Sequence, residues 1–465
     1  MKQISRREFV KGGLAALTVG ALSALPDIPS PAADQPANKP NIVFLFADQL
    51  RFCSLGCMGD KQVHTPNADK LASQGMLFTN TFSGFPLCSP YRAMMLTGRY
   101  GQTTGMVTNS LTLPYDEITI AKVLKKQGYA TGYVGKWHLE GGAKNGTLEQ
   151  RSQGFDHWHT QTANYRADGG PGGKQIPDEH TTEAIQYIKD HKDKPFALFL
   201  SWLPPHPPHI APEKYLAMYD KSKLKLRPNV DGDYAEVTAH YYAQITALDD
   251  NIGRLTAAIK DAGIEDNTIV VYTSDHGEML GSHGQMQKQR PWEEACHVPF
   301  ILRYPAHVKA GTKTDALMNS VDIMPTLLGL VGAPVPDGVQ GHDLSAFALG
   351  KKGKEQDSVF LQDILPCGQA VETGIREWRG VRTKRYTYAR FRDKGWVLYD
   401  NQSDPYQKNN LIDKPEAKDI QAKLEKELQG WLSRTKDDFA SAETWRARSK
   451  MPPEPNKKNA GGNRK

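Results

Sequence analysis

The residues with the clearest chemical potential lie in the stretch 87–99. Cys88, Pro90 and Arg92 stand in a Cys-x-Pro-x-Arg spacing, and Thr-Gly-Arg follows at positions 97–99. A helix is expected to begin near Pro90, which places Cys88 at a helix N-terminus, where backbone N–H groups and the helix dipole favour an anion. Cys-x-Pro-x-Arg alone fixes three positions and recurs by chance, and an unpaired cysteine is commonly a small buried thiol. The longer pattern favours a reactive residue.

Further polar side chains follow four predicted strands, each at the point where the strand ends. Taken alone, such residues are commonly helix caps, solvated lysines or packed histidines. Ligands of an open α/β sheet bind at the carboxyl ends of its strands, so we expect these groups to meet. They are Asp48-Gln49 after strand 41–46, Lys136 and His138 after strand 129–134, His206 after strand 196–202, and Asp275-His276 after strand 268–273.

The elements that position these residues alternate between strands and helices. The clearest helix covers 235–262, where apolar residues recur every three or four positions and Gly263 ends the helix. This pattern predicts a doubly wound α/β catalytic domain over 38–350. Shorter alternating strands at 359–363, 378–383, 385–390 and 396–400, with a helix at 414–432, predict a small antiparallel subdomain over 355–440. Residues 140–180 show little periodicity and are expected to form a long surface excursion near the site.

The cysteine stretch and the four strand ends, in this order, resemble the type I sulfatases of the alkaline phosphatase superfamily. The resemblance covers residues 40–413 and implies a large mixed sheet flanked by helices, with the small C-terminal sheet beside it. It also implies that a formylglycine-generating enzyme oxidises Cys88 to formylglycine, the nucleophile.

The same resemblance implies the catalytic roles. Lys136 and Lys288 would neutralise the sulfate oxygens, and Arg92 would position the modified Cys88. His138 would hold or deprotonate the second hydroxyl of the hydrated aldehyde, and His206, with Lys288, would lie on the leaving-group side as general acid. His209, three residues after His206, is either a substrate contact or loop packing. Arg99, His283 and His297 are expected to be structural.

The resemblance further implies one divalent cation held by Asp48, Gln49, Asp275, His276 and the oxygen derived from Cys88. An oxygen-rich shell favours Ca²⁺. Gln49 stands where a second Asp is frequent in the family, and His276 stands where Asn is frequent. One carboxylate fewer and one nitrogen more weaken the preference for calcium, so Mn²⁺ stays open as the alternative.

The N-terminal segment indicates export. Residues 1–33 hold Arg6-Arg7 before an apolar run from Gly12 to Leu25, which predicts a twin-arginine signal peptide and a partner in the twin-arginine translocase. The run is too short to cross a bilayer, and we expect no membrane span. The predicted location is periplasmic or secreted.

The charge is unevenly distributed. The signal segment contributes +2 and residues 446–465 contribute +6 to the total of +6, which leaves −2 for residues 34–445. The body is therefore not a polycation and does not favour nucleic acid as a partner. Residues 446–465 are expected to be a disordered basic tail. Cys53, Cys57, Cys296 and Cys367 permit a disulfide, but their spacing implies none.

Three functions follow. The first is an exported sulfatase acting on sulfate esters, with sulfated carbohydrates as the expected substrates. The second is a phosphonate monoester or phosphodiester hydrolase of the same superfamily, in which an Asp-His pair also occurs. The third is an inactive sulfoglycan-binding protein, which the intact set of catalytic residues disfavours.

Overall fold

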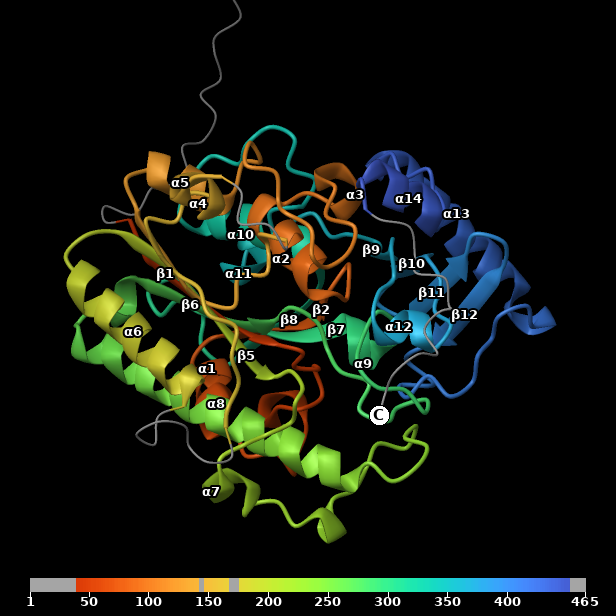
Figure 1. The fold of residues 1–465 in the computed structure, drawn as a ribbon, viewed down its shortest axis with the longest axis horizontal. Coiled ribbons are helices and arrows are strands. Elements are labelled where there is room, and N and C mark those ends of the chain that lie inside the picture. The colour runs from red at the N-terminus through yellow and green to blue at the C-terminus, as the bar shows by residue number, and fades with distance from the viewer. Residues whose placement is uncertain (1–38, 142–145, 167–174, 452–465) are drawn as a thin grey trace, which may run out of the picture. The chain divides into compact units, whose positions relative to one another are not determined.

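A mixed sheet of eight strands lies at the centre of the catalytic domain (Figure 1). The computed structural model describes residues 39–141, 146–166 and 175–451, which belong to one compact unit that begins at Pro36. The strand order is β4-β3-β5-β1-β6-β7-β2-β8. The strands are β1 (Asn41–Asp48), β2 (Met76–Phe82), β3 (Ala130–Gly135), β4 (His157–His159), β5 (Phe196–Pro205), β6 (Thr268–Ser274), β7 (His297–Arg303) and β8 (Thr312–Asn319).

Strand β1 shows why the sheet is covered on both faces. Its apolar side chains alternate between two separate cores, as the period of two in a strand requires. One core contains Ile42, Phe44 and Phe46, and the other contains Val43, Leu45 and Ala47. A continuous apolar run of this kind is the sequence signature of an internal parallel strand, which is buried on both faces.

Each core is closed by its own set of helices. Helices α2 (Cys88–Thr97), α4 (Ile120–Lys126), α10 (Ile323–Leu330) and α11 (Ser345–Ala348) supply residues to the first core, whereas α1 (Pro66–Ser73), α6 (Ile176–His191) and α8 (Ala235–Asp261) supply residues to the second. Short helices fill the connections: α3 (Gly101–Thr104), α5 (Leu148–Arg151), α7 (Glu213–Leu216), α9 (Glu293–Cys296) and α12 (Gln369–Glu372).

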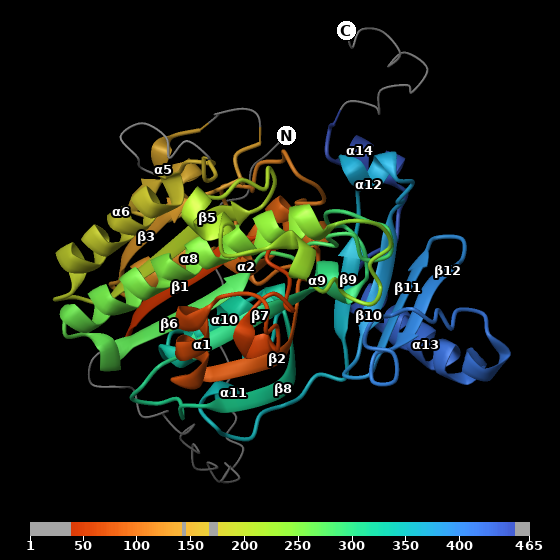
Figure 2. The ribbon, with the colours of Figure 1, turned by 90° about the horizontal axis from the view of Figure 1, so that it is seen from below.

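A second sheet of four antiparallel strands follows in the order β12-β11-β10-β9. Helix α13 (Lys418–Thr435) lies against it (Figure 2), and the chain continues into α14 (Ala442–Arg448). The strands are β9 (Val359–Asp363), β10 (Trp378–Arg382), β11 (Tyr386–Phe391) and β12 (Gly395–Asp400). One core joins this sheet to the catalytic domain, because it contains Leu424 and Trp431 of α13 together with Leu87 and Met94 around α2. The predicted fold class is confirmed.

Some details differ from the sequence expectation. Helix α6 begins at Ile176 rather than near 183, with Pro177 in its first turn, and the 140–180 region contributes edge strand β4 to the main sheet. Strands β2 and β8 were not expected, and β8 is an edge strand with polar residues at its start. Arg446–Arg448, assigned from the sequence to the basic tail, end α14.

The export segment and most of the predicted tail lie outside the described residues. Among the residues that are described, no helix combines the length and the apolar character that a membrane crossing needs. All five cysteines are free thiols, so the structure shows no disulfide among Cys53, Cys57, Cys296 and Cys367.

Candidate active site

Four neighbouring parallel strands bring the predicted residues together. Strands β3, β5, β1 and β6 lie side by side in the sheet and point the same way. Their carboxyl ends therefore lie along one edge. Asp48 is the last residue of β1, Lys136 follows β3, His206 follows β5, and Asp275 follows β6.

Gly135 sets the direction in which Lys136 leaves its strand. Its φ is +98°, and a Cβ atom at this position would lie 2.0 Å from the carbonyl oxygen of Ser201, so only glycine fits. The next residue, Lys136, donates its backbone N–H to that same carbonyl. Its Nζ then donates to Asp48 Oδ2 at 2.5 Å and lies 3.6 Å from Cys88 Sγ.

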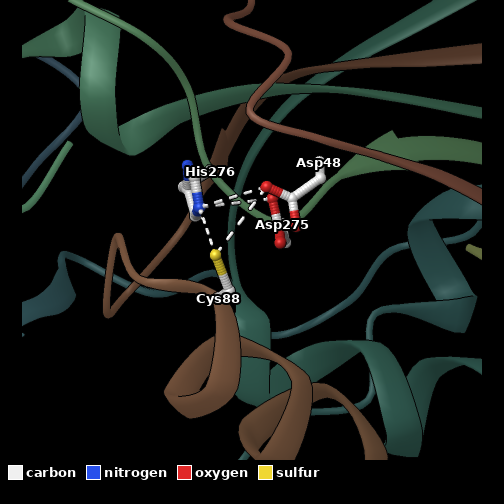
Figure 3. A group of neighbouring side chains, drawn as sticks. All are labelled: Asp48, Cys88, Asp275 and His276. Atoms are coloured by element: carbon white, nitrogen blue, oxygen red, sulfur yellow. Dashed lines mark hydrogen bonds and ion pairs between the residues drawn. The ribbon is translucent and has the colours of Figure 1, made fainter. Parts of the chain in front are cut away.

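Cys88 opens helix α2 and points into this group (Figure 3). Its side chain is 1% exposed. The sulfur lies 3.3 Å from His276 Nε2, 3.7 Å from Asp48 Oδ1 and 3.4 Å from Lys288 Nζ. Burial and Asp48 act to raise the pKa of the thiol, but Lys136, Lys288 and His276 outweigh them and hold this pKa well below its usual range. The surroundings of Cys88 therefore favour an anion.

The two carboxylates respond differently to the same buried setting. Burial acts to raise the pKa of Asp48, but the cations around it, led by Lys136, hold it well below its usual range. Burial, together with the nearby charge of Asp48, raises the pKa of Asp275 to about 7. Two carboxylates this close together repel each other, and a cation between them removes that repulsion.

The donor set fits a divalent cation. One atom each from Asp48, Cys88, Asp275 and His276 can be chosen so that all four lie within 4.8 Å of one another. His276 Nδ1 is 2.9 Å from the carbonyl oxygen of Gly277. Because a carbonyl only accepts, Nδ1 carries the proton, and in the neutral ring Nε2 keeps a lone pair directed at the cluster. Carboxylate oxygens with one imidazole nitrogen suit Ca²⁺ or Mn²⁺.

Arg92, one turn after Cys88 on α2, connects both carboxylates to the strands. Nη2 donates to Asp48 Oδ2 at 2.9 Å and to Asp275 Oδ2 at 3.1 Å. Nη1 donates to the Lys136 carbonyl at 2.6 Å and to Ser201 Oγ at 2.7 Å. Arg92 is 1% exposed, so its guanidinium does not face solvent and instead fixes the positions of the two carboxylates relative to the strand ends.

Gln49 was assigned to the metal shell, but its amide makes other contacts. Oε1 accepts a hydrogen bond from Lys288 Nζ at 2.6 Å, and Nε2 donates to Glu278. Glu278 in turn accepts backbone N–H groups of Leu280 and Gln287. Gln49 therefore orients Lys288 toward Cys88 in this structure, and its role as a metal ligand stays a prediction.

His206 and His209, in the proline-rich segment that follows β5, belong to one hydrogen-bond network. His206 donates Nδ1–H to the carbonyl of Pro207, and its own carbonyl accepts from Asn164. Asn164 Oδ1 accepts from Gln244, whose Oε1 lies 3.2 Å from His209 Nδ1. Burial lowers the pKa of His206 to about 4, so its ring is neutral near pH 7 with Nε2 unprotonated. Its predicted role as an acid requires that Nε2 first takes up a proton.

His138 adopts a φ of +60°, and its carbonyl accepts the hydroxyl of Ser89, the residue after Cys88. Its Nδ1 is buried and has no hydrogen-bond partner among the residues that the structure describes. A buried nitrogen of this kind is suited to a hydroxyl group that enters with the substrate or with a modified Cys88.

The remaining predicted residues have local partners. Arg99 pairs with Glu117 at 2.7 Å, His297 contacts Glu293 and the carbonyl of Thr79, and His283 stacks on Trp292. The sequence analysis missed Glu278, Asn164 and Gln244. Glu278 lies three residues after Asp275 and could have been noticed there, whereas no pattern distinguishes the other two.

Comparison with known proteins agrees with this geometry. The chain matches the Sulfatase family over residues 40–333 and the family described as N-sulphoglucosamine sulphohydrolase, C-terminal, over residues 281–434. It is 39% identical over 430 residues to an ulvan-active sulfatase of Formosa agariphila, which covers 88% of this chain and 84% of that protein. An endo-4-O-sulfatase of Bacteroides thetaiotaomicron is 29% identical, with coverages of 88% and 95%.

Solved structures show the same architecture. A Bacteroides fragilis structure superposes with a TM-score of 0.77 at 32% identity, covering 88% of this chain and 99% of that one. The phosphonate monoester hydrolase of Agrobacterium radiobacter, at 22% identity, shares the fold with a TM-score of 0.74 and coverages of 85% and 96%. The chain therefore belongs to the sulfatase family and is a sulfuric ester hydrolase.

Proposed function

We propose that this enzyme hydrolyses sulfate esters of carbohydrates through a formylglycine made from Cys88, with a divalent cation bound beside it. The observation that carries the proposal is the buried group of Cys88, Asp48, Asp275 and His276 at the start of α2, with two lysine ammonium groups within 3.6 Å of the sulfur. Relatives described as an ulvan-active sulfatase and an N-acetylglucosamine-6-O-sulfatase support a carbohydrate substrate.

Formylglycine and the cation would supply the reactive chemistry. Formylglycine would supply a hydrated aldehyde with one hydroxyl as the nucleophile and a second hydroxyl whose deprotonation expels sulfate and restores the aldehyde. Asp48, Asp275 and His276 would hold a divalent cation, which would supply positive charge to the sulfate oxygens. The donor set described above fits both groups, because the side chain of residue 88 is the fourth member of the cluster.

The chain's own residues bind, orient and move protons. Lys136 and Lys288 lie where they can neutralise the sulfate oxygens, and their low exposure strengthens that interaction. Arg92 keeps the carboxylates of Asp48 and Asp275 in place. His138 would accept a hydroxyl proton at its free Nδ1, and His206 would give a proton from Nε2 to the leaving oxygen.

His206 can become an acid when the substrate arrives. Its pKa is low because burial outweighs the attraction of Asp48. A bound sulfate ester adds negative charge next to the ring and therefore raises this pKa. Proton uptake at Nε2 would thus accompany substrate binding.

A screen of defined sulfated saccharides tests the proposal directly. The native enzyme is assayed for sulfate release, and the peptide that contains Cys88 is analysed by mass spectrometry. We expect a mass change from thiol to aldehyde at residue 88 and turnover of at least one sulfated sugar. An unmodified thiol in active enzyme would refute the formylglycine assignment, and no turnover of any sulfated sugar would refute the substrate class.

The second candidate function is hydrolysis of phosphonate monoesters or phosphodiesters. It is supported by the Asp275-His276 pair, which the resemblance associates with phosphonate monoester hydrolases as well as with some sulfatases, and whose His276 Nε2 lies 3.3 Å from Cys88 Sγ. Matched aryl sulfate and aryl phosphonate esters separate the two functions. A higher kcat/KM for the phosphonate would reverse our assignment.

We also infer that residues 1–33 direct export through the twin-arginine translocase to the periplasm or beyond. The argument is the Arg6-Arg7 pair before a short apolar run. Replacing both arginines with lysine should leave the enzyme in the cytoplasmic fraction. Export that continues after this change would contradict the inference.

A further inference from the structure

We propose that a basic cavity formed by loops 51–62 and 223–230 binds a second anionic group of a sulfated polysaccharide, apart from the ester that reacts at Cys88. The inference rests on the proposed function for the class of ligand. It adds a binding site that shares no lining residue with the catalytic group.

The cavity has a volume of about 770 Å³. Loops 51–62 and 223–230 form two of its walls, and Pro405 and Tyr406, which follow β12, contribute from the C-terminal subdomain. A pair of hydrogen bonds joins the two loops at the mouth, since the backbone N–H of Lys225 donates to Gln62 Oε1 at 2.7 Å and Gln62 Nε2 donates to the Lys225 carbonyl at 3.0 Å. The opening is therefore held in one shape.

The lining of the cavity is strongly positive, although residues 34–445 together carry a charge of −2. Its basic residues are Arg51, Lys61, Lys223, Lys225 and Arg227. The lining contains one carboxylate, Asp60, which accepts a hydrogen bond from the hydroxyl of Tyr242. Such a concentration of cations in a concave surface attracts anions more strongly than isolated surface lysines do.

Only part of this charge is balanced by neighbours. Arg227 pairs with Glu294 at 3.0 Å and Lys223 with Asp220 at 3.0 Å. Lys61 and Lys225 are exposed and form no ion pair with any described residue. These two lysines at the mouth are free to bind an anionic group.

Arg51 gives the most specific sign of a ligand. Its side chain is 3% exposed, and its Nε donates to Ser54 Oγ at 2.8 Å. Nη1 is buried and has no hydrogen-bond partner within the described part of the chain. A buried guanidinium donor without an acceptor is costly, and an oxygen of a sulfate or carboxylate group that enters the cavity would satisfy it.

The aromatic residues of the lining suit the sugar that carries the anion. Phe52, Tyr242 and Tyr406 line the cavity, and Arg227 lies over the rings of Phe52 and Tyr406 at 5.7 and 5.0 Å. The ring of Tyr406 offers apolar surface beside the cations, whereas the hydroxyl of Tyr242 is already bonded to Asp60. Cations beside aromatic rings therefore favour a charged saccharide over a free inorganic ion.

Binding is tested with Cys88→Ala enzyme, which lacks the thiol from which the nucleophile is made, and with dextran sulfate as the probe. Neutral dextran and inorganic sulfate are the comparison ligands. We measure affinity by calorimetry at about 0.1 M salt, where long-range surface attraction is screened. The cavity variant is Lys61→Glu with Lys225→Glu, and the matched control is Lys309→Glu with Lys313→Glu, two exposed lysines outside the cavity lining.

We expect the cavity variant to bind dextran sulfate about tenfold more weakly or worse, because it loses two charge-assisted contacts. Hydrogen exchange should slow in segments 57–62 and 223–230 when dextran sulfate is added. Equal losses in the cavity and control variants, or no loss in either, would overturn the proposal. Equal protection by inorganic sulfate would reduce the cavity to a simple ion site and would also overturn it.

Turnover separates this inference from the proposed function. The same lysine variants with Cys88 intact should hydrolyse a small aryl sulfate at the wild-type kcat and KM, whereas KM for a sulfated polysaccharide substrate should rise. If neither the wild-type enzyme nor the variants release sulfate, the proposed function fails. The binding measurement with dextran sulfate still decides the inference about the cavity.

Discussion

Replacing Gln49 with methionine distinguishes a metal ligand from a residue that orients Lys288. Methionine has nearly the length of glutamine but lacks the carbonyl that accepts from Lys288 Nζ at 2.6 Å. Lys288 is 6% exposed, so water cannot readily replace the lost partner. A hydrogen bond to a charged group contributes about 1.5–3 kcal/mol. If the whole loss is felt in the transition state, kcat/KM falls by roughly 10- to 150-fold.

The assay combines kinetics with metal analysis. We expect Gln49→Met to lower kcat/KM for an aryl sulfate while the metal content per chain stays at the wild-type value. Asp275→Asn is the comparison, because it changes a carboxylate of the donor cluster and should lower the metal content. A loss of metal from Gln49→Met as large as that from Asp275→Asn would refute our reasoning and make Gln49 a ligand. Unchanged kinetics would refute the positioning role.

Four further outcomes are expected. Chelation of the metal should abolish activity, and Ca²⁺ or Mn²⁺ should restore it. At about 100 times its Kd the ion should stabilise the fold by about 2.7 kcal/mol, which a calorimetric Tm checks. An unchanged Tm would count against the ion site. His276→Ala should weaken metal binding at least about tenfold, measured by titration, and unaltered affinity would remove His276 from the shell. His206→Asn should reduce kcat by roughly 10²- to 10⁴-fold for sugar sulfates and much less for aryl sulfates with good leaving groups, and equal losses would exclude the acid role. Burial lowers the pKa of His180 to about 4, below its unfolded value near 6.5, so the free energy of unfolding should fall by about 2 kcal/mol between pH 7 and pH 5 as the unfolded histidine takes up a proton. In urea unfolding, His180→Phe should show a decrease over this pH range that is smaller by about 2 kcal/mol. A pH profile identical to that of the wild type would refute this role of His180.

The strand ends were predictable from the sequence for a simple physical reason. In a parallel sheet, the carboxyl ends of adjacent strands lie along one edge, so Asp48, Lys136, His206 and Asp275 had to come close once their strands were recognised. Strand β1 was recognisable because it is buried on both faces and is apolar throughout. The two cores that cover its faces follow from the alternation of its side chains between those faces.

Side-chain contacts between distant loops were not predictable in this way. Gln49 follows β1 at a position where a metal ligand is expected, and only the fold shows that its amide Nε2 donates to Glu278. Asn164 contacts His206 from a region without periodicity, and Gln244 reaches the network from the middle of a long helix. Edge strand β8 was missed because its first residues are polar and pack on one side only.

The burial of α2 also bears on how active enzyme is made. All ten residues of the helix are buried, and Cys88 is among them. Within the described part of the chain, this helix has no exposed residue that another enzyme could bind. Any enzyme that oxidises Cys88 must therefore act on the new chain before α2 packs against the sheet. If Cys88 is converted to formylglycine, as we propose, the yield of active molecules would depend on the rate of this modification relative to folding, and a variant that folds more slowly would have a higher activity per molecule.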